Sequence, residues 1–385
     1  MTEPRERFAA LREVCGSAVA DGVGPGAVVL CAEGGVTRFH EAFGARQLEP
    51  TTIPATPDTV YDVASVTKAV VTSVLAMRAV AANELALGDP VGRWQPQFHG
   101  GGKDAVTVRH LLCHASGLPA HRPFYAPFVA PNLPPAHASA SLGVEVGARR
   151  DAIVAAAAAE PLVTPPGTRS VYSDLGFILL GDLLERRAGA GLDALIERSL
   201  LRPLGLRSTT FVRLDGLGGR TPALEGVAAT ERCERRGRLI AGEVHDLNAY
   251  AMGGVAGHAG LFSTAADLGR IAAALVAAWH GDAGEPVVPT EVIREFWQPA
   301  GIPGSTWRLG WDGPALHASQ AGTRLSRGAV GHLGFTGCSL WIDPPRRLWI
   351  IVMANRVHPV VRDDPRFRAF RPAVHDAAMR GLDAA

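Results

Sequence analysis

The chain has 385 residues, of which 47% are hydrophobic and 19% charged, and its formal net charge is +1. A chain of this length and composition can bury a large core, so we expect an ordinary soluble globular protein of one large domain or two lobes. A net charge this close to zero gives no general reason to bind nucleic acid or an acidic membrane surface.

The sequence shows no export signal and no membrane span. Residues 1–8 begin with charged side chains, without a basic region followed by an apolar one. The longest apolar stretches, around 152–159 and 271–279, are too short and too rich in alanine to cross a bilayer. The five cysteines are odd in number and lack a Cys-x-x-Cys spacing. We therefore expect free thiols and a cytoplasmic protein.

The predicted elements run from strands through helices back to strands. A helix ending near Ala20 precedes a hairpin with a strand at 26–31 and a turn at 34–35. Helical spacing of apolar residues predicts a helix from 65 to about 83. Further expected elements are helices at 151–160, 175–187 and 192–200, a capping box at 264–267, and strands at 340–343 and 348–353. This order suggests one sheet formed by both ends of the chain.

Lysine is rare in this chain, since only Lys68 and Lys103 occur, and Lys68 follows Ser65 by three positions. Side chains three apart on a helix are neighbours, so the Lys68 amine can reach the Ser65 hydroxyl. Lysine can lose its proton, whereas arginine cannot, and the helix N-terminus offers N–H groups to an oxyanion. The spacing predicts a nucleophile with its base, although one such pair can also arise by chance.

Two later motifs accompany this pair: Tyr-Ser-Asp at 172–174 and His-Leu-Gly at 332–334. Together with the segment 107–119, they follow the order and spacing of the β-lactamase and penicillin-binding-protein superfamily, which the chain resembles over essentially its whole length. The stretches 242–249 and 253–264 are similar to a subgroup that includes D-alanyl-D-alanine carboxypeptidases and a muramyl-peptide amidase.

The resemblance implies an α/β (α+β) fold of the β-lactamase/transpeptidase type, with an antiparallel sheet flanked by helices and a mainly helical lobe. Residues 1–385 would form one catalytic domain, with an α/β lobe from about 1–64 and 286–385 and a helical lobe from about 65–285. The segment 120–135 would be a variable loop near the mouth of the site. No cofactor and no metal are expected.

The resemblance also implies catalytic roles. Ser65 would attack an ester or amide carbonyl, and Lys68 and Tyr172 would share the task of general base, with the resting base left open. Tyr172 would then protonate the leaving group. The oxyanion would lie between the backbone N–H groups of Ser65 and Phe335, and His332 would supply a donor or a partial positive charge. Seen alone, the tyrosine and the histidine are equally compatible with core positions.

Asp174, Leu333 and Gly334 would contact the substrate. Two of them, Asp174 and Leu333, depart from the family pattern. Asp174 stands where asparagine is usual, so it could pair with Lys68 or attract a cationic group. Leu333 replaces a hydroxyl residue that helps the family bind the carboxylate of β-lactams and D-alanyl peptides. The sequence therefore favours a serine hydrolase of esterase or peptidoglycan-fragment amidase or carboxypeptidase type, with a small-molecule substrate. A weak β-lactamase and an inactive binding module remain the alternatives.

Two further patterns in the sequence point to other kinds of site, but each lacks the motif that would complete it. The His-Gly-Gly-Gly run at 99–102 imitates the oxyanion loop of lipase-type α/β-hydrolases, but no Gly-x-Ser-x-Gly elbow accompanies it. His110 and His114 lie one helical turn apart, and His245, Asp246 and His258 form a second group. Without a His-Glu-x-x-His motif, we expect these residues to form structural hydrogen bonds rather than to bind a metal, and His245 and Asp246 could border the substrate cleft.

Overall fold

The computed structural model describes residues 4–129, 142–214, 226–284 and 286–384. Residues 130–135 of the expected loop near the site lie outside the described residues. Within the described part, no helix combines the length and the apolar character needed to cross a membrane. All five cysteines are free and buried.

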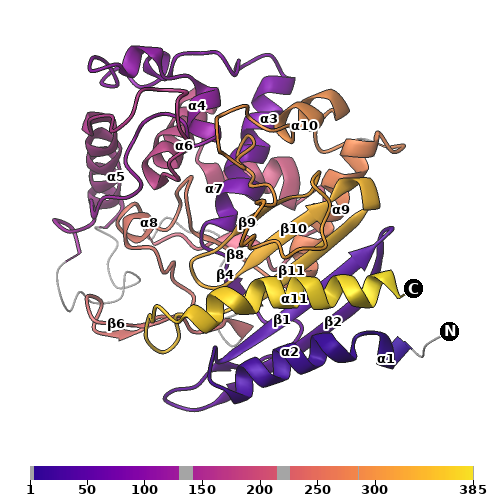
Figure 1. Cartoon of the computed structure of the whole chain (residues 1–385). Helices are drawn as coiled ribbons and strands as arrows, with labels where there is room; N and C mark the ends of the chain where they lie inside the picture. The colour runs from indigo at the N-terminus through magenta and orange to yellow at the C-terminus, as the bar shows by residue number, and fades with distance from the viewer. Residues whose placement is uncertain (1–3, 130–141, 215–225, 285, 385) are drawn as a thin grey trace.

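A six-stranded antiparallel sheet lies at the centre of the molecule, in the order β3-β2-β1-β11-β10-β9 (Figure 1). Its N-terminal strands are β1 (Gly26–Glu33), β2 (Val36–Gln47) and β3 (Ile53–Pro54), and its C-terminal strands are β9 (Val330–Leu333), β10 (Ser339–Asp343) and β11 (Leu348–Ala354). The two halves join where β1 pairs with β11, with Val29 opposite Val352. The prediction that both ends of the chain form one sheet is confirmed.

Both faces of the sheet are covered, which explains why β11 is apolar throughout. The helices α2 (Ala9–Ala20) and α11 (Pro365–Asp383) lie side by side on one face, and α1 (Pro4–Arg7) precedes them (Figure 1). The helix α9 (Ala265–His280) lies on the other face. Because successive side chains of a strand point to opposite faces, Val29 and Ile350 pack toward α2 and α11, whereas Leu30 and Ile351 pack toward α9.

The remaining elements come from the part of the chain between β3 and β9, apart from one short segment between β10 and β11. A three-stranded sheet contains β4 (Tyr61–Asp62), β8 (Leu261–Ser263) and β5 (Thr210–Phe211), and β6 (Arg232–Cys233) pairs with β7 (Arg238–Leu239). The α-helices are α3 (Val74–Ala81), α4 (Val108–Leu112), α5 (Leu142–Ala159), α6 (Asp174–Ala188), α7 (Leu192–Ile196), α8 (Leu247–Ala251) and α10 (Thr290–Phe296). The short π or 3₁₀ segments are η1 (Lys68–Ser73), η2 (Val91–Arg93), η3 (Lys103–Ala105), η5 (Glu197–Leu201) and η7 (Pro344–Arg346).

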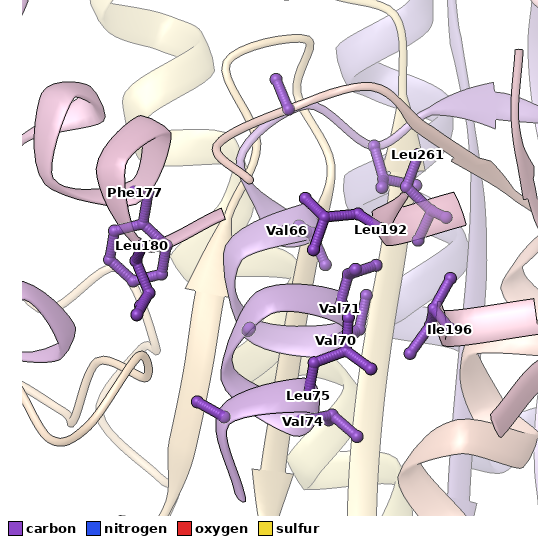
Figure 2. Packing of buried hydrophobic residues seen from close by; sticks show 14 of the residues in the cluster. Val66, Val70, Val71, Val74, Leu75, Phe177, Leu180, Leu192, Ile196 and Leu261 are labelled. Carbon is purple, nitrogen blue, oxygen red and sulfur yellow. The ribbon is translucent and has the colours of Figure 1, made fainter. Parts of the chain in front are cut away.

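The helix that follows Ser65 is buried on all sides and forms the centre of the larger core. It was expected as one helix from 65 to about 83; it begins with π-helical turns in η1 and continues as α3 to Ala81. Asn83, with a φ of 56°, closes its end in the left-handed region that asparagine tolerates. Figure 2 shows Val66, Val70, Val71, Val74 and Leu75 along this helix, with Leu192 and Ile196 of α7 and Leu261 of β8 nearby.

Two details differ from the sequence-based expectations. The capping box at 264–267 is only half formed: Thr264 accepts from the backbone N–H of Asp267, but the Asp267 carboxylate instead accepts from Ser208 and Thr209. The helix α9 packs on the sheet, although its residues belong to the range expected for the helical lobe. The helix α10 packs on α3, although its residues belong to the range expected for the α/β lobe. The exact lobe boundaries stay a prediction.

Candidate active site

Ser65 follows a backbone turn that its neighbours hold in an unfavourable conformation. After β4, Ala64 has a φ of 47°, in the left-handed region that costs energy for a residue with a Cβ. The Asp62 carboxylate holds this turn by accepting from the N–H of Ala64 at 2.8 Å. The N–H of Thr67 then donates to the Ala64 carbonyl at 3.0 Å, which starts the helix. The turn brings Ser65 to the wall of a cavity.

The Lys68 ammonium is completely buried and has three acceptors. Its Nζ lies 2.9 Å from Ser65 Oγ, 2.9 Å from the His258 carbonyl oxygen and 2.8 Å from Asp174 Oδ1. Burial alone would lower the pKa of Lys68, but the negative charge of Asp174 and the Tyr172 hydroxyl outweigh it and raise that pKa. The lysine therefore carries its proton at rest.

Asp174 is the first residue of α6 and faces two basic groups. Besides its ion pair with Lys68, its Oδ2 lies 3.4 Å from Nδ1 of His121. Burial opposes the charge of this carboxylate, but Lys68 and the hydrogen bond to His121 hold its pKa well below the usual range. Of the two roles that the sequence left open for Asp174, the structure shows the pairing with Lys68.

The Tyr172 hydroxyl faces the same groups, since the charge of Lys68 and hydrogen bonding with Lys68 and Ser65 act to lower its pKa. Burial, more than any other cause, raises the pKa of Tyr172 although the Lys68 charge opposes the rise, so the hydroxyl is neutral at rest. Lys68 Nζ also lies 5.0 Å from the centre of the tyrosine ring. Three aromatic rings surround this ring, with centroid distances of 4.7 Å for His114, 5.6 Å for Trp307 and 6.0 Å for His332.

His114 holds the chain on both sides of Tyr172. Its carbonyl accepts from the N–H of Val171 at 2.7 Å, and its Nδ1 accepts from the N–H of Ser173 at 3.1 Å. Its φ of 56° lies in the left-handed region. Burial and the nearby Lys68 charge hold its pKa well below the usual value, so the ring is neutral. These are the structural hydrogen bonds expected of His114, but no sequence motif indicates that they support Tyr172.

His332 is buried near Lys68, and this environment determines its charge. Burial, with the Lys68 charge second, lowers its pKa to about 3, so the ring has no positive charge at neutral pH. Its Nδ1 donates to the Leu333 carbonyl at 2.8 Å, which leaves Nε2 as an acceptor. Among the described residues this buried Nε2 has no partner. A neutral ring argues against a positive charge on His332, and its catalytic role stays a prediction.

The turn after β9 lies against the chain just before Ser65. A Cβ on Gly334 would lie 2.5 Å from the Val63 carbonyl oxygen, so only glycine allows this approach. Within the described part of the chain, neither the Ser65 N–H nor the Phe335 N–H donates a hydrogen bond to the protein. Both are thus free for a ligand oxygen, and their role as an oxyanion hole stays a prediction.

A cavity of about 630 Å³ brings most of the expected site residues together. Lys68 lies buried behind Ser65 and does not line it. The expected residues in its wall are Ser65, Tyr172, Asp174, His332, Leu333, Gly334 and Phe335, and those that sequence reasoning missed include His121, Tyr125, Trp307, Asp312, Arg356 and Arg371. The missed residues come from distant loops and from α11, and only the first two lie in a segment expected near the site.

His245 and Asp246 border the cavity, the position that the sequence allowed for them. Asp246 Oδ1 lies 2.9 Å from Nε2 of His258, and His245 Nε2 lies 3.6 Å from Glu231. His110 caps α4 by accepting at Nδ1 from Thr107, 3.2 Å away. Across the described ranges, no group of three or more His, Cys, Asp or Glu side chains is placed to hold a metal ion.

Comparison with known sequences supports this arrangement. The family model described as Beta-lactamase matches residues 11–373. A putative D-alanyl-D-alanine carboxypeptidase from Escherichia coli (strain K12) is 31% identical over an alignment of 352 residues that covers 84% of this chain and 77% of the relative. An N-acetylmuramyl-L-alanine amidase from Bacillus subtilis (strain 168) is 31% identical over 365 residues, covering 88% of this chain and 79% of that protein.

Solved structures share the fold at lower sequence identity. EstCE1, a hydrolase with promiscuous acyltransferase activity, has a TM-score of 0.72 and 21% identity, covering 98% of this chain and all of its own. A penicillin-binding protein homologue from Caulobacter crescentus has a TM-score of 0.69 and 22% identity, covering 97% of this chain and 98% of that one. These likenesses concern the fold, and the expected antiparallel sheet flanked by helices is confirmed.

Proposed function

Because the chain belongs to the Beta-lactamase family, we propose that it is a serine hydrolase that cleaves an ester or amide through an acyl-enzyme. The observation that carries this proposal is the 2.9 Å contact between Lys68 Nζ and Ser65 Oγ at the wall of the cavity. An inactive binding module would not need this contact, since burying a charged lysine costs desolvation energy that a binding role does not require.

In the acylation step, Ser65 Oγ attacks the carbonyl carbon and forms a new C–O bond. The serine proton passes to the network formed by Tyr172 and Lys68, and Tyr172 returns a proton to the leaving group as its bond to the carbonyl carbon breaks. The N–H groups of Ser65 and Phe335 stabilise the negative charge on the carbonyl oxygen. In deacylation, water attacks the acyl carbonyl carbon and gives a proton to the network. The bond from this carbon to Ser65 Oγ then breaks, the acid product leaves, and the network returns a proton to Ser65.

The raised pKa values of Lys68 and Tyr172 bear on this mechanism. Both groups hold protons at rest, so the network accepts the serine proton only after one of its own has left. We therefore treat the pair as a single base whose deprotonated form becomes more common as the pH rises. Asp174 opposes this deprotonation, since its charge stabilises the ammonium and disfavours a phenolate.

For the substrate, we propose an ester or a peptidoglycan-derived amide. The carboxypeptidase and amidase names of the relatives support this class. Leu333 in the cavity wall offers no hydroxyl, so efficient binding of a β-lactam carboxylate at that position is not expected.

Turnover of a short-chain nitrophenyl ester, a muramyl peptide and a chromogenic cephalosporin tests the proposal. We expect the wild type to cleave the first two faster than the third, and Ser65→Ala to cleave none. Equal rates for wild type and Ser65→Ala on every substrate would contradict the hydrolase and favour the binding module.

A further inference from the structure

A second cavity, of about 610 Å³, lies at the far end of the helix that begins with Ser65. Figure 2 follows this helix from Val66 to Leu75, and Leu75 is part of the cavity wall. At a rise of about 1.5 Å per residue, Arg78 lies about 20 Å along the helix from Ser65. The described residues that line this cavity are different throughout from those that line the active-site cavity. The two cavities are therefore separate.

Three arginines from three segments contribute to the wall of the second cavity. Arg78 comes from the last turn of α3, Arg187 from the last turn of α6, and Arg198 from η5. Among the wall residues that the structure describes, Glu84 is the one carboxylate. Three guanidiniums against one carboxylate give the wall a formal net charge of +2.

These guanidiniums keep hydrogen-bond donors that the described part of the protein does not use. Arg198 is exposed and forms no hydrogen bond or ion pair with any described residue. Arg78 donates once, from Nη1 to the Val287 carbonyl at 2.5 Å. Arg187 pairs with Glu84 through Nη1, but its buried Nε has no described partner. Since a guanidinium carries five N–H donors, most donors in this wall are available to a ligand.

Stabilisation of helix ends explains only part of this arrangement. The carbonyls at the C-termini of α3 and α6 carry partial negative charge, which arginines in the last turn stabilise. Each terminus corresponds to only about half an elementary charge, so these ends do not offset a net charge of +2. The wall therefore keeps positive charge that the described residues do not compensate.

We propose that this cavity binds a small phosphate monoester with an apolar body. A phosphate monoester carries a charge of about −1.5 to −2 at neutral pH, which matches the net charge of the wall. Its oxygens accept hydrogen bonds from guanidinium forks in pairs. The volume of about 610 Å³ is typical of small-molecule sites. Apolar side chains between the arginines suit the organic part of the ligand; they are Leu75, Leu184, Leu195, Val287 and Val288.

Calorimetry with three probes tests the site: benzyl phosphate, inorganic phosphate and the neutral benzyl alcohol. Each is titrated into the full-length protein at low and constant ionic strength, because salt screens the charges. The test variant is Arg198→Met, which removes the guanidinium without a described partner and should leave the fold intact. The matched control is Arg202→Met, because Arg202 is exposed, lies four residues further on and is outside the wall.

We expect benzyl phosphate to bind the wild type and Arg202→Met equally, and more tightly than inorganic phosphate or benzyl alcohol. Arg198→Met should weaken the binding of benzyl phosphate by about tenfold or more, because it loses charge-assisted hydrogen bonds. Equal affinities in wild type and Arg198→Met, or no binding to the wild type, would overturn the site. Inorganic phosphate binding as tightly as benzyl phosphate would contradict the apolar part of the proposal.

A further variant separates this site from the active-site cavity, which also has arginines in its wall. Binding of benzyl phosphate that is lost in Arg371→Met and kept in Arg198→Met would place the anion in the active-site cavity and overturn the second site. The proposed hydrolase function is tested independently by turnover of the nitrophenyl ester without phosphate. That rate should be the same in wild type and Arg198→Met, and absence of turnover in both counts against the hydrolase function only.

Discussion

The centre of the sheet and the floor of the cavity are both buried, but they are built in opposite ways. The paired strands β1 and β11 are almost entirely apolar and extended, and nearly every side chain in them is buried. The floor, by which we mean the residues in and directly behind the cavity wall around Ser65, contains the buried Lys68 and two non-glycine residues with positive φ, Ala64 and His114. It also contains a buried histidine nitrogen without a partner at His332. The sheet stabilises the fold, and the floor is a strained, polar arrangement that the surrounding structure holds in place.

Replacing Lys68 gives the largest expected effect on the floor. Lys68→Met removes the ammonium beside Ser65 and leaves Asp174 buried without its cation, so the rate of Ser65 acylation should fall by about 10²–10⁴-fold. The matched control is Lys103→Met. Lys103 is also buried, but it donates to the Ala158 carbonyl at 2.6 Å, away from the cavity, so its loss should leave the acylation rate within about twofold.

The acylation rates are read by stopped-flow with an activated ester. Equal losses in the two lysine variants would show that burial of any lysine, rather than its position beside Ser65, determines the rate.

A substitution in the sheet should lower the stability of the protein and leave its activity unchanged. Ile350 is fully buried in β11 and packs toward α2 and α11, away from the cavity. Ile350→Ala should lower the free energy of unfolding by about 2–5 kcal/mol through the cavity that it leaves. Urea denaturation measures this loss of stability. At a temperature where the variant is folded, its kcat/KM should stay near the wild-type value. A large fall in kcat/KM of the folded variant would mean that the sheet and the floor are coupled.

Two substitutions at His114 separate the effect of its hydrogen-bond acceptor, Nδ1, from the effect of its size. In His114→Asn, the side-chain oxygen stands at the δ position, as Nδ1 does, and can accept from Ser173 N–H; asparagine also tolerates the positive φ. In His114→Gln the acceptor lies one bond further out. We expect kcat/KM to be about tenfold lower for the glutamine variant than for the asparagine variant, the effect of about one hydrogen bond. Equal kcat/KM values for the two variants would show that His114 Nδ1 does not support Tyr172.

The smallest expected effect is a shift in pH dependence. Asp174 raises the pKa of Lys68 and of Tyr172, although burial is the largest influence on each. Asp174→Asn removes that rise, so the network loses its proton at lower pH, and the limb of the kcat/KM profile that rises with pH should move to lower pH. Stable folding across the range is checked by circular dichroism. A limb that stays in place or moves to higher pH would contradict the assigned role of Asp174.

The sequence predicted the parts of the molecule that depend on local pattern. Apolar runs identified β1 and β11, and the three-residue spacing placed Lys68 beside Ser65 because helix geometry fixes that contact. The order of the later motifs placed Tyr172 and His332 in the same cavity. In each of these cases, a short segment or a family pattern carries the information.

The remaining features depend on contacts between distant segments. Trp307 and Arg371 reach the cavity from parts of the chain without a recognisable motif. The positive φ of Ala64 gave no signal, because no glycine marks it. The neutral state of His332 results from burial and from the nearby Lys68 charge, neither of which can be read from its motif.

If Ser65 is an activated nucleophile, a fluorophosphonate probe should modify it, and mass spectrometry of the intact protein detects the adduct. We expect a single adduct on the wild type and none on Ser65→Ala. No adduct on either protein, or the same adduct on both, would contradict this role of Ser65.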